Sequence, residues 1–326
     1  MKQRLILMFA LILSSALVKP MGATSGGEWI AQDSGTTYTL NSVWFLDHNR
    51  GFVVGGDTLL KTLDGGNHWQ KVDVNIKGTL KKVSFVNSKG WITVAGVGTY
   101  YMLHSNDWGE TWERVVVPPD NQRSHIFVSE NRGWISATGG FNRGVWRTDN
   151  GGDTWDWKGE GLANWIFSIY FYDQNTGFVV NDWRRMWRTN NGGDSWQEIG
   201  RWGYTNDNPQ AFAFISPEEG FFANGGVIYH TADSGTSWQS CPDTLNSGAI
   251  HILNPSNIWA VGLNGVAYYS QDQGKVWQSI ATGQENNLYS VFFPDAQHGW
   301  AVGYGGTILK YYRKSAVQNW TLYDSR

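Results

Sequence analysis

The chain has 326 residues, of which 41% are hydrophobic and 16% are charged, so it is neither intrinsically disordered nor a coiled coil. Its 40 glycines and 20 tryptophans are typical of a tightly turned β protein that is rich in aromatic residues. A formal net charge of -3 supplies no basic field for a phosphate backbone, so nucleic acid is not expected as a partner.

The first 23 residues have the pattern of a secretory signal peptide. Two basic residues precede an apolar run at residues 5–18, and cleavage is expected after Ala23, with a cut after Ala16 as the alternative. A membrane-spanning helix needs about 20 apolar residues, and Lys19 and Pro20 interrupt this run before that length is reached. The sequence therefore predicts a secreted or periplasmic protein without stable membrane insertion, and a retained N-terminal anchor is the alternative.

An eight-residue motif, Thr/Ser-x-Asp/Asn-x-Gly-x-x-Trp, occurs six times along the rest of the chain. Its copies end at Trp69, Trp112, Trp155, Trp196, Trp238 and Trp277. Each copy follows an apolar strand, a Gly-aromatic pair and a Gly-rich turn, so each unit contains four short antiparallel strands. A repeated unit of about 40 residues with four strands is typical of a propeller blade.

Seven such units can be counted. Their first strands are expected near residues 40–46, 80–86, 124–129, 166–172, 210–215, 249–253 and 288–293. This predicts an all-β fold, a seven-bladed β-propeller of four-stranded antiparallel blades with Asp-box turns at residues 24–312, followed by a C-terminal tail at 313–326. The seventh unit lacks a motif, and an N-terminal strand near residues 29–32, beginning with Trp29, is expected to complete it. A closing strand from the tail around Trp320 is the competing arrangement.

The repeated motif is predicted to be a structural turn. Its Asp or Asn oxygen and its Thr or Ser hydroxyl can accept hydrogen bonds from backbone N–H groups of the turn, and its Gly permits a backbone conformation that a side chain would obstruct. Catalysis or Ca²⁺ binding is the alternative, but two copies carry Asn, which lacks the charge that Ca²⁺ favours. The expected structural residues are Asp64, Asp107, Asn150, Asn191, Asp233 and Asp272.

The motif, the G-W-A-V-G turn and the V-x-F inner strand together resemble the photosystem II stability and assembly factor family of Asp-box, or BNR-type, β-propellers. The segment from Leu288 to Lys310 resembles that family most, and the resemblance extends over about residues 29–312. It implies a non-catalytic, secreted or lumenal scaffold that holds another protein during assembly. Sialidases and xyloglucan-active glycoside hydrolases also carry the box, so a carbohydrate-active propeller, either a glycosidase or a lectin-like module, is the alternative.

No catalytic constellation can be assigned from the sequence. A glycosidase needs two carboxyl groups about 5–9.5 Å apart, and the apolar stretches of the expected inner strands contain none. Asp57 and Asp182, between second and third strands, form one candidate pair, although each is also a typical turn residue. The seven histidines form no close pair and Cys241 is the only cysteine, so no metal, cofactor or internal disulfide is expected.

A cluster of arginine and aromatic residues is predicted on one face of blades three and four. It comes from their turns between the second and third strands and from the loop that leaves blade four. The expected members are Phe141, Arg143, Trp183, Arg184, Arg185, Arg201, Trp202 and Tyr204. Arg, Trp and Tyr are enriched in interface hot spots, so we expect a monomeric scaffold that binds a protein partner through this patch. A sugar that stacks on the same aromatic residues is the alternative ligand.

Overall fold

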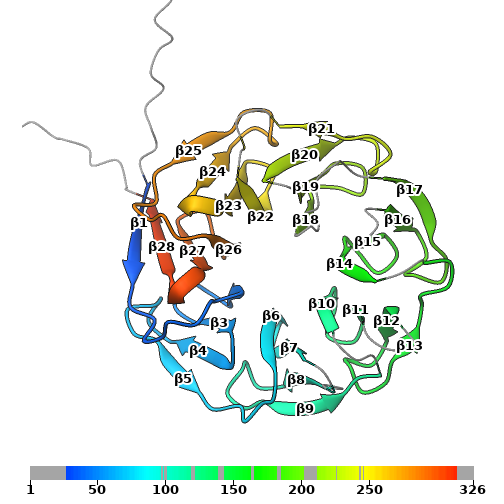
Figure 1. Cartoon of the computed structure of the whole chain (residues 1–326), viewed down its shortest axis with the longest axis horizontal. Coiled ribbons are helices and arrows are strands. Elements are labelled where there is room, and N and C mark those ends of the chain that lie inside the picture. The colour runs from blue at the N-terminus through cyan, green and yellow to red at the C-terminus, as the bar shows by residue number, and fades with distance from the viewer. Residues whose placement is uncertain are drawn as a thin grey trace, which may run out of the picture.

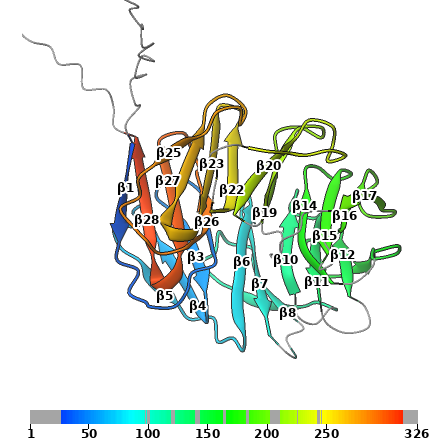
Figure 2. The ribbon, with the colours of Figure 1, turned by 45° about the horizontal axis from the view of Figure 1, so that its top comes forward.

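The computed structural model describes residues 27–96, 98, 101–118, 122–138, 143–162, 165–181, 185–201, 211–224, 226–241, 244 and 246–313. Its strands form seven sheets of four antiparallel strands, arranged as a ring around a central axis (Figures 1 and 2). The predicted seven-bladed propeller is therefore confirmed. The expected signal peptide and nearly all of the C-terminal tail lie outside the described residues. Nothing helical in the described ranges has the length and apolar character needed to cross a bilayer.

In blades one to three, four consecutive strands follow one another from the axis outward. Blade one contains β2 (Ser42–Phe45), β3 (Gly51–Gly55), β4 (Thr58–Thr62) and β5 (Gln70–Val72). Blade two contains β6 (Thr79–Val86), β7 (Lys89–Ala95), β8 (Tyr101–Ser105) and β9 (Glu113–Val116). Blade three contains β10 (Gln122–Phe127), β11 (Gly133–Ala137), β12 (Gly144–Thr148) and β13 (Asp156–Trp157).

Blades four to six repeat this order, and blade seven departs from it in its outer strand. Blade four contains β14 (Ile166–Phe171), β15 (Gly177–Asn181), β16 (Arg185–Thr189) and β17 (Gln197–Arg201). Blade five contains β18 (Ala211–Phe214), β19 (Gly220–Asn224), β20 (Val227–Thr231) and β21 (Gln239–Ser240). Blade six contains β22 (Ser247–Asn254), β23 (Asn257–Gly262), β24 (Ala267–Ser270) and β25 (Gln278–Ile280). Blade seven contains β26 (Leu288–Phe292), β27 (His298–Gly303), β28 (Ile308–Arg313) and β1 (Gly27–Gln32).

The strand from the N-terminal end of the described chain closes the ring. β1 runs antiparallel to β28, with Trp29 opposite Tyr311, and the two strands lie side by side in both views (Figures 1 and 2). Trp29 is buried and meets the ring of Phe293 edge-on, at 6.0 Å and 84°. A tryptophan from the far end of the chain thus takes the place that the motif tryptophan has in other blades. Trp320, on which the competing arrangement depends, lies outside the described residues.

Neighbouring blades are joined by a repeated stack of three aromatic rings. Between blades two and three, Trp91 of β7 lies face to face with Phe127 of β10, at 3.7 Å and 8°. The motif residue Trp155 then meets Phe127 edge-on, at 6.2 Å and 79°. The face-to-face pair recurs as Phe52–Phe85, Trp134–Phe171, Phe178–Phe214, Trp259–Phe293 and Trp300–Phe45. Offset stacked and edge-to-face pairs are the favoured aromatic geometries, so each interface gains energy beyond the burial of apolar area.

The glycine before each second-strand aromatic leaves room for the phenylalanine ring of the same blade. A Cβ added to Gly90 would overlap the ring of Phe85, its register partner on the inner strand. The same overlap occurs at Gly51, Gly133, Gly177, Gly220 and Gly299. Blade six lacks both members of the pair, because Ile258 replaces the glycine and its register partner Ile252 replaces the phenylalanine. The glycine is therefore needed only where the ring is present.

We expect Gly90→Ala to destabilise the protein by about 1–3 kcal/mol, because the new methyl group forces the Phe85 ring out of its stack. Adding Phe85→Leu should recover part of that loss, since a smaller side chain opposite the methyl group relieves the overlap. Urea denaturation of the wild type, both single variants and the double variant measures this coupling. Strictly additive losses would contradict the steric explanation.

We expect deletion of residues 24–33 to lower the melting temperature strongly, because it removes β1 and the buried ring of Trp29. Deletion of residues 314–326 should have a mild effect. Thermal denaturation followed by circular dichroism compares the two truncated proteins. A larger loss from the C-terminal deletion would place the closing strand in the tail.

Candidate functional site

The two faces of the ring carry different loops. On one face the chain enters each inner strand and turns from the second to the third strand; we call this the start face. On the opposite face the inner strands end and the eight-residue motifs turn; we call this the motif face. The motif turn bonds to the first turn of its own blade there, as when the amide of Gly65 donates to the carbonyl of Asn49 at 2.8 Å.

On the motif face, each repeated motif uses its polar oxygens within its own turn. The Thr62 hydroxyl accepts the amide of Gly66 at 2.8 Å and donates to Oδ1 of Asp64 at 2.9 Å. Oδ1 of Asp64 also accepts the amide of His68 at 2.9 Å. The same three bonds recur around Asp107, Asn150, Asn191, Asp233 and Asp272. Because an amide oxygen serves at two of the six positions, the turn needs an acceptor and not a charge.

Hydrogen bonds within the turn also favour the ionised form of these carboxyl groups. The pKa of Asp64 is lowered to about 2, mainly because its carboxylate accepts a hydrogen bond from the backbone amide of His68. The pKa of Asp107 is lowered to about 2, mainly because its carboxylate accepts a hydrogen bond from the Thr111 hydroxyl. Across the described ranges, no three side chains of His, Cys, Asp or Glu gather into a potential metal site. The motif carboxylates therefore lie apart and act within separate turns.

We expect Asp64→Ala to lower the free energy of unfolding by about 1 kcal/mol at pH 7, because two hydrogen bonds lose their acceptor. Asp64→Asn should be close to neutral, as Asn150 and Asn191 indicate. The folded-state pKa of about 2 lies below the reference value of 3.8, so the contribution of the charged group is complete above pH 4. It is lost as the pH falls through 2, where the wild type should lose stability that Asp64→Asn, which has no carboxyl group to titrate at this position, retains.

Thermal denaturation of the wild type, Asp64→Ala and Asp64→Asn at both pH values measures this difference. Ligand or partner affinity should stay unchanged at temperatures where the Ala variant is folded. A loss of affinity at unchanged stability would instead make the motif a binding site.

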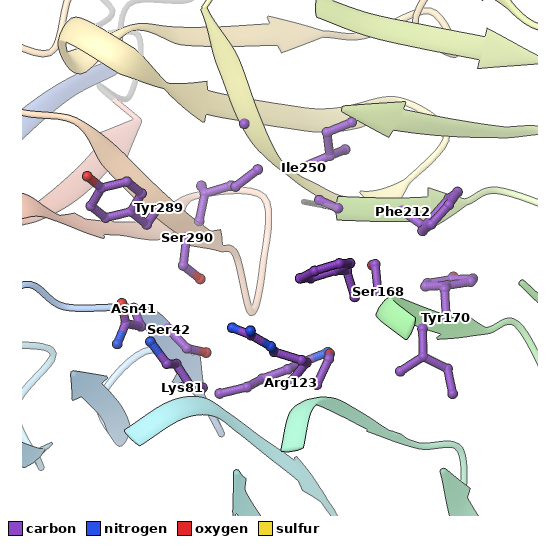
Figure 3. Close-up of a pocket in the computed structure, with 18 residues that line it drawn as sticks. Asn41, Ser42, Lys81, Arg123, Ser168, Tyr170, Phe212, Ile250, Tyr289 and Ser290 are labelled. Carbon is purple, nitrogen blue, oxygen red and sulfur yellow. The ribbon is translucent and has the colours of Figure 1, made fainter. Parts of the chain in front are cut away.

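A cationic opening lies at the centre of the start face. Its cavity has a volume of about 290 Å³ and is lined by residues from all seven inner strands and the segments that enter them (Figure 3). The charged residues among them are Lys81 and Lys82 of β6 and Arg123 of β10, and Arg123 extends toward the middle of the opening (Figure 3). No aspartate or glutamate is among the described residues that line this cavity.

These three cations form no ion pair with any carboxylate in the described part of the chain. Arg123 is exposed, donates to the hydroxyl of Thr138 at 3.3 Å and lies 5.3 Å from the ring centre of Phe167. Burial lowers the pKa of Lys82 to about 8, and burial together with the charge of Arg123 lowers that of Lys81. Because no negative group among the described residues compensates them, the opening presents a positive potential to an approaching anion.

The cavity continues along the axis toward the motif face. Lys82 and Tyr170 line both the start-face cavity and a second cavity of about 380 Å³. Trp44 and Phe292 line both the second cavity and a third, of about 590 Å³, at the motif face. The walls change along this path, because the third cavity is lined mainly by Trp44, Phe45, Leu46, Phe85, Trp108, Ile252, Leu253, Phe292, Phe293 and Pro294. The described residues thus form a channel that is cationic at one end and apolar at the other.

Comparison with known proteins identifies the family. The sequence profile of a family described as photosynthesis system II assembly factor YCF48 matches residues 21–155 and 243–312. The chain belongs to this family. No curated protein matches the chain.

Solved structures of YCF48 have the same fold. A structure described as YCF48 bound to D1 peptide is 22% identical, with a TM-score of 0.71 over 88% of this chain and 97% of that chain. YCF48 from Cyanidioschyzon merolae is 20% identical, with a TM-score of 0.71 over 87% and 99% of the two chains. A GH74 xyloglucanase from Xanthomonas campestris is 13% identical, with a TM-score of 0.69 over 87% of this chain and 53% of that chain. At such low identity these likenesses establish the propeller fold alone.

The arginine and aromatic patch predicted for this YCF48-family chain is described only in part. Arg143 and Arg185 lie at the start face, beside the turns between the second and third strands of blades three and four. Arg143 is exposed, and its carbonyl accepts the indole N–H of Trp157 at 3.3 Å. Arg185 forms an ion pair with Glu198 at 3.0 Å, which engages one edge of its guanidinium. Phe141, Trp183, Arg184, Trp202, Tyr204 and the side chain of Arg201 lie outside the described residues.

Sequence reasoning missed the cations of the central opening. Lys81 and Lys82 stand in T-L-K-K-V-S-F and Arg123 stands in Q-R-S-H-I-F. Basic residues at the start of otherwise apolar inner strands were the available signal, because inner strands converge on the axis.

The candidate pair of carboxylates does not help to assign a catalytic site. Asp57 is exposed and accepts a hydrogen bond from the hydroxyl of Thr58 at 3.1 Å, while Asp182 lies outside the described residues.

Proposed function

We propose that this YCF48-family propeller is a non-catalytic assembly scaffold that binds a carboxylate-bearing segment of a protein partner at its start face. The observation that carries the proposal is the start-face opening, in which Lys81, Lys82 and Arg123 meet without a carboxylate among the described lining residues. Guanidinium groups bind carboxylates through paired hydrogen bonds, and ammonium groups add charge attraction. Within the described residues, no carboxylate already pairs with these three cations and would compete with a bound carboxylate.

Exposed aromatic residues near the opening supply apolar contact area. Trp165 at the entrance to β14, Tyr289 on β26 and Tyr304 between β27 and β28 are 46%, 37% and 58% exposed. Aromatic and arginine side chains on one surface are the usual composition of protein-binding hot spots. The start face therefore fits a peptide that combines acidic and apolar residues.

The family comparison supports a protein partner, because a solved YCF48 structure is described as bound to a D1 peptide. For this chain we propose the same class of ligand, a protein segment, without carrying over its identity. A secreted or periplasmic location, expected from residues 1–23, is part of the proposal. A contribution from Trp183, Arg184 and Trp202 of the predicted patch is also part of it.

We expect an acidic peptide with flanking aromatic residues to bind the wild type, and its Asn/Gln counterpart to bind much more weakly. Arg123→Gln combined with Arg143→Gln should weaken the acidic peptide more than tenfold, equivalent to about 1.4 kcal/mol, because two start-face charges are lost. Fluorescence anisotropy at low and physiological salt measures these affinities, and salt should weaken the wild-type interaction.

The matched control removes the same number of charges from the motif face, as Lys89→Gln combined with Lys275→Gln. This variant should bind the acidic peptide like the wild type. Equal losses in both double variants, or equal binding of the Asn/Gln peptide, would contradict the start-face site. Binding of an oligosaccharide at the same surface without peptide binding would favour the carbohydrate alternative.

A further inference from the structure

The interior of the channel has properties that peptide binding at the rim does not use. Of the three cations, Lys82 alone lines both the outer and the middle cavity, whereas Lys81 and Arg123 line the outer cavity only. Lys82 therefore marks the point where the cationic opening narrows into the channel. Its side chain is surrounded by protein on all sides but remains accessible to solvent through the channel.

Beyond Lys82 the wall of the middle cavity combines apolar side chains with the neutral polar groups of Ser84, His125 and His251, and the cavity after it is mainly apolar. Val83 and Phe85 follow Lys82 along β6, and three residues of strand span about 10 Å. The same middle cavity is lined by the rings of Trp44 and Phe292, which are tilted by 35° with their centres 4.5 Å apart. The path then opens into the apolar cavity of about 590 Å³ at the motif face. An apolar tail bound here would leave water and contact aromatic and aliphatic side chains.

The titratable groups around Lys82 leave its charge uncompensated. Lys81 and Arg123 are cationic neighbours at the opening. Burial holds the pKa of His125 well below 6.5 and lowers that of His251 to about 4, so both imidazoles are neutral above pH 6. Burial raises the pKa of Tyr170 to about 12, so its hydroxyl is neutral as well. No carboxylate of the described residues lines the middle cavity. A bound anion would supply the missing negative charge.

We propose that the channel binds a medium-chain monocarboxylate, with the carboxylate at Lys82 and the hydrocarbon chain extending along β6 toward the motif face. Fatty acids such as decanoate match this arrangement, since they join one anionic group to a flexible apolar chain of the length of the path. This site shares Lys82 with the start-face opening, but its hydrocarbon chain lies in the channel interior, whereas the proposed peptide contacts Arg123 and Lys81 at the rim.

Isothermal titration calorimetry with decanoate at pH 7 should show one saturable site on the wild-type protein. Acetate, which lacks the chain, and decanol, which lacks the charge, should bind at least tenfold more weakly. Lys82→Met keeps the length of the aliphatic stem but removes the ammonium group, and should weaken decanoate at least tenfold. The matched variant Lys81→Met, which changes a neighbouring lysine that lines only the outer cavity, should bind decanoate nearly as well as the wild type.

The pH dependence gives a second readout. Lys82 has a pKa of about 8 in the free protein, and a bound carboxylate would raise it. Affinity should therefore be complete between pH 6 and 7 and fall as the pH rises through 8, because binding then requires proton uptake. Lys82→Arg should retain decanoate binding but lose this fall, since the guanidinium stays protonated.

Thermal melting of each variant establishes that it is folded. Absence of saturable decanoate binding to the wild type, equal binding of decanol, or unchanged affinity in a folded Lys82→Met variant would each overturn the proposal. The double variant Arg123→Gln and Arg143→Gln should keep decanoate binding while it loses the acidic peptide. Its behaviour distinguishes a failure of the channel site from a failure of the peptide site.

Discussion

The three-ring aromatic stack between blades is the interaction on which the rest of this structure depends. A four-stranded blade has two broad faces and cannot bury both by itself, so its stability comes from its neighbours. The stack meets this need with one geometry at six of the seven interfaces, including the pair Trp300–Phe45 that joins the last blade to the first; between blades five and six, where Ile252 replaces the phenylalanine, Phe221 meets Trp277 edge-on. Because the phenylalanine sits at the end of the inner strand, each stack also fixes how far that strand lies from the axis.

Hydrogen bonds between inner strands reinforce the same spacing closer to the axis. The Ser42 hydroxyl accepts the amide of Val83, the Ser290 hydroxyl accepts the amide of Val43, and the Tyr170 hydroxyl accepts the amide of Phe214, each at 3.3 Å. His125 bonds to Ser84 and Thr93 in the buried wall of the channel. Polar side chains of the inner strands thus satisfy backbone groups of the next blade, as buried polar groups must. The channel keeps its width because its lining residues are part of the inter-blade framework.

The two faces of the ring then acquire different chemistry. On the motif face, the repeated Asp, Asn, Ser and Thr side chains have their oxygens engaged within their own turns. On the start face, the longer loops and the entrances of the inner strands bring cations and exposed aromatic rings together. Lys82, which lines both the start-face opening and the middle cavity, joins this surface to the proposed site for a small amphipathic anion.

The sequence by itself determined the repeat, the number of blades and the role of the motif, because five of the seven units contain the whole local pattern: a Phe, the Gly that makes room for its ring, and a turn with its own acceptors. In blade six the sequence contains a joint replacement: Ile252 stands in place of the Phe, and its register partner Ile258 stands in place of the Gly. Only the tertiary structure placed β1 beside β28, since both ends of the sequence offered a tryptophan. Only the packing of blade two against blade three brought Lys81, Lys82 and Arg123 together, because residues about 40 positions apart meet where inner strands converge on one axis.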